Sequence, residues 1–183
     1  MTIEELCRRS HDVAVAKGWH ESKRTFGEAI ALFHSEVSEA LECYRDPEHQ
    51  PGDVWYSGDG KPEGIVIELA DLLIRIGDTV VDMGIPLFGN ILSTAKEVAD
   101  LGVIYGHEEE KRLGIPDLLA KIHADLSAAF ESSDGHDRAY ELYCALADVG
   151  ILCLSRGWNL ERAVTLKMEY NETRAYRHGG KRA

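Results

Sequence analysis

The sequence predicts an all-α fold, and three observations lead to that prediction. Apolar residues recur at helical spacing along most of the 183 residues. No stretch of four to eight residues alternates as a half-buried strand should. A two-helix pattern in the first half is repeated in the second, and two such hairpins bury their apolar faces against each other as a four-helix bundle. The length suits a single domain.

The first half of the chain predicts three helices. Two amphipathic segments, 2–18 and 26–44, are followed by a loop over 46–64 that holds three prolines and four glycines. A loop of that length is suspected of a function. The segment 65–83 is apolar on most of its faces, so it predicts a buried helix in which each charged residue needs a partner.

The second half predicts four more helices and a basic tail. The helical segments are 88–101, 116–132, 138–156 and 159–175. The tail contains His178-Gly179-Gly180-Lys181, which either folds over a phosphate group or frays.

An internal repeat organises these helices into units. Residues 34–41 align with 123–130 at a shift of 89, residues 68–71 align with 145–148, and residues 84–87 align with 157–160. The sequence thus predicts one domain made of a unit over 1–85 with a complete acidic site, a degenerate repeat over 86–156, and a closing helix with its tail over 157–183. The repeat is degenerate because it has lost most of its acids. The positions of Glu36, Glu39, Glu68 and Asp71 are taken in the second unit by Asp125, Ala128, Ala145 and Asp148.

Composition restricts the classes of partner. Thirty-two acidic and twenty basic residues give a net charge of −12, which argues against a nucleic-acid binder. No apolar run approaches the roughly 20 residues of a membrane span, and the first residues do not resemble a signal peptide. The four cysteines show no CxxC spacing, so neither a disulfide framework nor a zinc site is expected. We therefore expect a cytoplasmic protein.

Two pairs of acids three residues apart are the strongest chemical signal. Glu36 and Glu39 share one helical face, and Glu68 and Asp71 share a face of the apolar helix. Converging carboxylates need a cation, and ligands that are all oxygen suit Mg²⁺, with Mn²⁺ as an alternative and room for two ions.

The acidic pairs have two other interpretations. An isolated ExxE is usually a solvated surface or a set of helix salt bridges, but the second pair lies where an unpaired charge is costly. A ferritin-like di-iron bundle requires a Glu-x-x-His on each of two helices, and neither acidic pair is followed by histidine at that step.

The last predicted helix and one tryptophan are candidate substrate contacts. Lys167, Asn171 and Arg174 fall on one helical face, where they either hold phosphate oxygens or form a basic helix end favoured by the helix dipole. Trp19 either stacks on a nucleobase or belongs to the core.

These motifs together resemble a known family, the all-α nucleoside triphosphate pyrophosphohydrolases of the MazG type, related to dimeric dUTPases and dCTP pyrophosphatases. The resemblance rests on HSEVSEALECYR (34–45), KPEGIVIELADLLIRIGD (61–78) and KMEYNETRAYRHGGK (167–181), with weaker support from AVAKGW (14–19). It covers residues 1 to about 85 and 157–183. About 70 residues intervene where the phage and bacterial members that it most resembles have almost none.

The resemblance implies a function and roles for the candidate residues. The four acids would bind Mg²⁺, one of Glu36 and Glu39 would orient the attacking water, and the Lys-Asn-Arg set would hold the phosphates. The products would be a nucleoside monophosphate and pyrophosphate. The alternative is a nucleotide sensor or scaffold of the same fold without turnover. Family members usually complete the bundle as homodimers, whereas the intervening repeat offers a way to complete it within one chain.

Overall fold

The computed structural model describes residues 1–86 and 113–177, and within these ranges it confirms the all-α class. The predicted helix over 88–101 and the tail motif at 178–181 lie outside the described residues. The described helices begin and end within about three residues of the predicted bounds. They are α1 (Ile3–Ala16), α2 (Phe26–Arg45), α3 (Ile65–Asp82), α6 (Ile115–Glu131), α7 (Gly135–Arg156) and α8 (Leu160–Thr173).

The helices that carry the acids start at well-defined residues. At α2, the Thr25 side chain accepts from the backbone N–H of Glu28, and the Glu28 carboxylate accepts from the backbone N–H of Thr25. The start of α3 depends on Gly64, whose φ is 131°. A Cβ there would lie 2.4 Å from the carbonyl oxygen of Asp53. Glu68 follows one turn later, so the sharp entry at Gly64 fixes where the first acid of α3 lies.

The long loop between α2 and α3 contains a short β ribbon, which the sequence analysis did not predict. Strands β1 (Trp55–Tyr56) and β2 (Pro62–Glu63) pair antiparallel, with Trp55 opposite Glu63. Two-residue strands are too short to show an alternating pattern. The ribbon places Lys61, the residue before β2, beside the start of α3.

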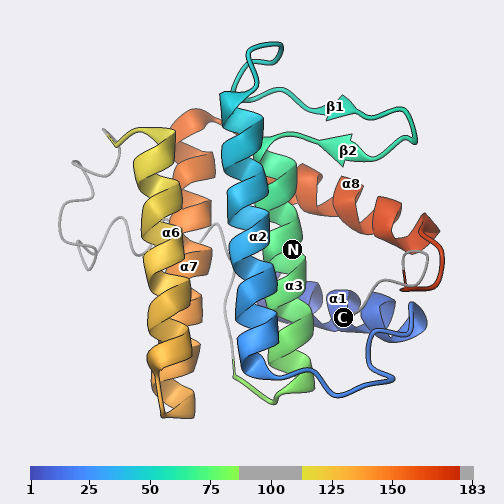
Figure 1. Cartoon of the computed structure of the whole chain (residues 1–183), viewed down its shortest axis with the longest axis vertical. Coiled ribbons are helices and arrows are strands. Elements are labelled where there is room, and N and C mark those ends of the chain that lie inside the picture. Colours follow the sequence, from blue (N-terminus) through green and yellow to red (C-terminus); the bar gives the residue numbers. More distant parts are fainter. Residues whose placement is uncertain (87–112, 178–183) are drawn as a thin grey trace.

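Helix α3 lies at the centre of the described structure. Figure 1 shows α2, α3, α6 and α7 side by side, with α1 and α8 running across them on the side of α3. Most side chains of α3 are buried, including Leu69, Leu72, Leu73 and Ile76. The arrangement is wider than the predicted four-helix bundle, because α1 and α8 also pack on α3. No described helix is long and apolar enough to cross a membrane.

The two hairpins meet at residues that the repeat alignment pairs. His34 on α2 and His123 on α6 are 89 positions apart, and their Nδ1 atoms are 2.7 Å apart. Their rings are stacked, with centroids 5.0 Å apart. The sequence correspondence therefore has a counterpart in space, while a common origin of the two units stays a prediction.

The chain after α8 is attached to the end of α1. The Lys17 ammonium donates to the carbonyl oxygens of Glu172 and Arg174, at 2.6 and 2.8 Å. Tyr176 packs where Gly18 leaves room for it, since a Cβ on Gly18 would lie 2.3 Å from the tyrosine ring. These contacts hold the end of α8 over the same side of α3 as α1.

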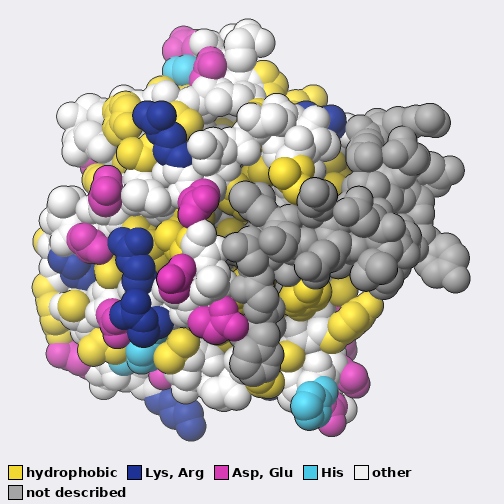
Figure 2. Space-filling model, turned by 180° about the vertical axis from the view of Figure 1, so that it is seen from behind, with side chains coloured by type: hydrophobic (Ala, Val, Ile, Leu, Met, Phe, Trp, Pro, Cys, Tyr) yellow, Lys and Arg dark blue, Asp and Glu magenta, His cyan; other side chains and the backbone are white. Residues whose placement is uncertain are grey.

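Figure 2 shows the molecule from behind, where lysine and arginine side chains lie among acidic ones and form no continuous basic surface over the described residues of that face. This distribution agrees with the acidic net charge of −12.

Candidate functional site

A cavity of about 410 Å³ brings most of the predicted site residues together. It lies among α1, α2, α3, the connection after α1, Lys61 and the end of α8. Six of the eight predicted residues line it, namely Glu36, Glu39, Asp71, Trp19, Asn171 and Arg174. Glu68 and Lys167 do not line the cavity, and both are buried.

Three of the predicted acids form a compact group. Glu36, Glu39 and Glu68 each offer a carboxylate oxygen, and these atoms lie within 4.8 Å of one another. Glu36 and Glu68 are 2% exposed, whereas the Glu39 side chain is 52% exposed and faces outward. The helical spacing and the packing of α2 on α3 explain this convergence. A group of hard oxygen ligands that is open on one side is a suitable donor set for Mg²⁺ or Mn²⁺.

The fourth acid, Asp71, has its own partners. Its Oδ2 lies 3.4 Å from the Lys167 ammonium, and its Oδ1 accepts a hydrogen bond of 3.3 Å from Asn171. Lys167 also donates to Glu68 at 3.1 Å, and its side chain is only 1% exposed. The structure therefore places Lys167 and Asn171 against the acids, and their predicted contact with phosphate stays a prediction.

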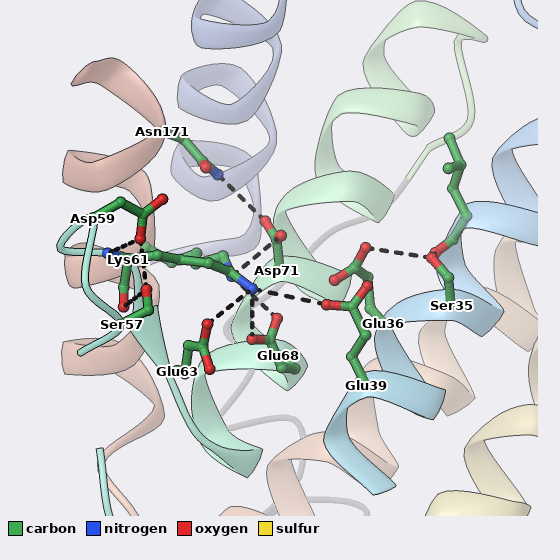
Figure 3. A network of polar contacts seen from close by, with 12 residues as sticks. Ser35, Glu36, Glu39, Ser57, Asp59, Lys61, Glu63, Glu68, Asp71 and Asn171 are labelled. Atoms are coloured by element: carbon green, nitrogen blue, oxygen red, sulfur yellow. Dashed lines mark hydrogen bonds and ion pairs between the residues drawn. The ribbon is translucent and has the colours of Figure 1, made fainter. Parts of the chain in front are cut away.

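Lys61 is a cation that the sequence analysis missed. Figure 3 shows its ammonium among the carboxylates of Glu39, Glu63 and Glu68. The three N–O distances are 3.9, 3.8 and 3.4 Å. This lysine begins the motif KPEGIVIELADLLIRIGD, but its position among the acids depends on the ribbon that folds it back over α3.

Arg75 is the second missed cation. It lies one helical turn after Asp71, and its Nε forms an ion pair of 2.7 Å with Glu36. It also lines the cavity. A signal existed in the sequence, since an arginine inside the apolar segment 65–83 needs a partner as much as the acids do.

The surroundings of the acids shift their pKa values in different directions. Burial and the nearby Asp71 carboxylate raise the pKa of Glu36 to about 7, although Arg75 opposes the shift. Burial also raises the pKa of Glu68, against the effect of Lys167 and Lys61. Burial acts in the same direction on Asp71, but Lys167 and Arg75 outweigh it and hold the pKa of that carboxyl below its usual value. The group therefore has a high affinity for positive charge, either protons or a metal ion.

A second polar group lies at the other end of the cavity. Asp78 and Arg24 line that end, and His11 and His20 contact Asp78 from outside the lining. Ser10 also lines the cavity, and its buried hydroxyl has no hydrogen-bond partner in the structure. This group was not predicted from the sequence, because its members are far apart in the chain.

The repeat unit keeps a reduced version of the acidic pair. Asp148, the counterpart of Asp71, is buried and lies 2.6 Å from the Lys121 ammonium. Burial and a hydrogen bond to Asp148 raise the pKa of Asp125 to about 7. No group of three potential metal ligands occurs in the part of this unit that the structure describes. The loss of a complete acidic site from this unit stays a prediction.

Comparisons with protein-family models, with curated proteins and with solved structures find no match. The function is therefore inferred from the site itself and from the motifs that it contains.

Proposed function

We propose that this protein hydrolyses a nucleoside triphosphate to the monophosphate and pyrophosphate in a Mg²⁺-dependent reaction. The observation that carries the proposal is the group of Glu36, Glu39 and Glu68, whose carboxylate oxygens lie within 4.8 Å of one another beside a cavity of about 410 Å³. A cavity of this size is in the range of small-molecule sites. The resemblance of the same residues to the MazG-type motifs supports the proposal.

The acids have distinct proposed roles. Glu36, Glu39 and Glu68 hold the metal, with Asp71 as the fourth ligand, and one of Glu36 and Glu39 orients the attacking water. Lys167 and Asn171 fix the orientation of Asp71 through contacts of 3.4 and 3.3 Å. When bound, Mg²⁺ lowers the pKa of water and offsets the negative charge of the phosphates.

The remaining cavity residues have proposed roles in binding the substrate. Arg174 lines the cavity at the end of α8, where two backbone contacts from Lys17 fix the local chain. A guanidinium there is suited to phosphate oxygens. Trp19 lines the same cavity and is the proposed platform for the base. The resemblance leaves a homodimer and a self-sufficient chain as alternatives.

The test is to incubate the purified protein with each ribo- and deoxyribonucleoside triphosphate and Mg²⁺ and to measure pyrophosphate. We expect turnover that needs the metal and that is abolished in Glu39→Ala and Asp71→Ala. Glu42→Ala is a matched control, because Glu42 lies on α2 three residues after Glu39 and pairs with Arg45 at the surface. Nucleotide binding without release of pyrophosphate would replace the hydrolase with the sensor or scaffold.

A further inference from the structure

Three potential metal ligands from three parts of the chain meet beside the cavity. They are His11 on α1, His20 in the connection after α1, and Asp78 on α3. The Oδ1 atom of Asp78 lies 3.1 Å from His11 Nδ1 and 2.6 Å from His20 Nε2. One ligand atom from each residue lies within 4.8 Å of the other two. The three side chains are a quarter exposed or less.

The spacing of these atoms resembles that around a small tetrahedral ion. Zinc bonds to nitrogen and carboxylate oxygen are about 2.0 to 2.1 Å long, so adjacent ligand atoms in a tetrahedral site are about 3.3 Å apart. The two measured distances are shorter than that value by about 0.2 and 0.7 Å. To surround an ion, both histidines would therefore have to move away from Asp78.

Two further residues support the ligands from outside. The second ring nitrogen of His20, Nδ1, lies 3.1 Å from Oδ1 of Asp82. The second oxygen of Asp78, Oδ2, lies 3.8 Å from the Arg24 guanidinium. A metal-bound histidine usually donates its other N–H to a carboxylate, and metal-bound carboxylates usually have a polar partner of their own.

The position of His20 between two carboxylates also indicates a bound cation. Its Nε2 faces Asp78 and its Nδ1 faces Asp82. A neutral imidazole donates through only one nitrogen, so the ring satisfies both acids only when it carries a second proton or when Nε2 binds a metal. A metal bound to Asp78 would also be within reach of His11, whose Nδ1 lies 3.1 Å from the same aspartate oxygen.

We propose that His11, His20 and Asp78 form a binding site for a transition-metal ion of the zinc class, separate from the carboxylate group proposed for Mg²⁺. Imidazole with one carboxylate suits zinc better than magnesium, which prefers oxygen ligands. Three protein ligands leave a fourth position for water or another small ligand. The ion would join α1 and the connection after it to α3 at one end of the cavity.

The experiment measures zinc binding to chelator-treated full-length protein by calorimetry in excess Mg²⁺. A second titration with Co²⁺ records the visible spectrum of the bound ion. We expect one zinc ion per chain, a Co²⁺ spectrum of a four- or five-coordinate site, and a higher melting temperature with zinc. His20→Gln and His11→Gln should each lose the bound ion. Asp82→Asn should weaken binding by about 10- to 100-fold, as expected for an outer partner of a ligand.

Two controls make the assignment specific. His49→Gln removes another histidine that pairs with an aspartate, at 2.8 Å from Asp46, and should leave zinc binding unchanged. Glu39→Gln should also leave it unchanged, because Glu39 belongs to the carboxylate group. Circular dichroism checks that each variant is folded. Three outcomes would each overturn the proposal: no zinc binding to the wild type, binding to both histidine variants as tight as to the wild type, or loss of binding in Glu39→Gln alone.

Discussion

Lys61 occupies the place where a metal ion would contact Glu39 and Glu68, so its removal should strengthen Mg²⁺ binding. Its ammonium lies 3.4 to 3.9 Å from three carboxylates, and two of these belong to the proposed metal ligands. Lys61→Met keeps most of the apolar length of the side chain and removes only the charge. The variant therefore tests whether the lysine and the metal compete for the same oxygens.

The expected magnitude follows from these distances. Each contact is worth about 1 kcal/mol when the dielectric constant is that of water. The Lys61 side chain is 26% exposed, so solvent screening and side-chain entropy reduce the total. A remaining difference of about 1 to 2 kcal/mol corresponds to a Mg²⁺ dissociation constant that is about five- to thirtyfold lower in the variant.

Calorimetric titration of metal-free protein with Mg²⁺ measures this difference without substrate. Lys23→Met is the control, because Lys23 is exposed and lies outside the cavity lining. An unchanged or higher dissociation constant in Lys61→Met would show that the lysine does not compete with the metal. Turnover by Lys61→Met should nevertheless fall. When the metal displaces the Lys61 ammonium from the carboxylates, that positive charge is left beside the substrate phosphates, and the variant lacks it.

Three further predictions concern other parts of the molecule. Arg174→Ala should lower kcat/KM by about ten- to a hundredfold, and by a similar factor for every base accepted, because phosphate is common to all substrates; a changed order of preference among bases would refute the phosphate role. Asp125 has a pKa of about 7 in the folded protein against an ordinary 3.8, so this group stabilises the fold below about pH 4 and loses that effect as the pH rises to about 7. Asp125→Asn should remove this part of the pH dependence in denaturant titrations, and an identical pH profile would contradict it. Gly64→Ala should lower the melting temperature, since its φ is 131° and a Cβ would lie 2.4 Å from Asp53 O, while Gly58→Ala, with open space around it, should not; equal melting temperatures would remove the role assigned to Gly64.

The helices were predictable because their signals are local. The Thr25 cap and the proline after Asp46 define α2 from neighbouring residues alone, and the apolar run of 65–83 defines α3. The β ribbon was missed because each strand has two residues, fewer than an alternating pattern requires. Packing of α1 and α8 on α3 was also not predicted, since helical spacing shows which face is apolar but not which neighbour covers it.

The candidate site was predictable only within single helices. A spacing of three residues places Glu36 near Glu39 in any helix, and the structure brings Glu68 to the same group. The sequence analysis treated Asp71 as equivalent to the other acids, whereas Lys167 and Asn171 bind it from a helix about 100 residues away. Lys61 was missed because its contacts with Glu39 and Glu68 depend on how the ribbon folds back, which helical spacing does not show.

At the proposed Mg²⁺ site, the charges around the acids favour one divalent ion over two. Lys167 is buried and Arg75 lies 2.7 Å from Glu36, so both are held closely by the acids, whereas Lys61 on the ribbon lies 3.4 to 3.9 Å from its three carboxylates. Four carboxylates, from the two acidic pairs, with these two closely held cations leave two negative charges, which one divalent ion neutralises. A second ion would require the release of Lys167 from its buried contacts, and an unpaired buried ammonium is costly. Calorimetry with wild-type protein should therefore give a Mg²⁺ stoichiometry of one in the absence of nucleotide. A stoichiometry of two would contradict this reasoning. It would show that a second ion binds without the phosphates of the nucleotide, and that Lys167 and Arg75 do not limit the number of ions.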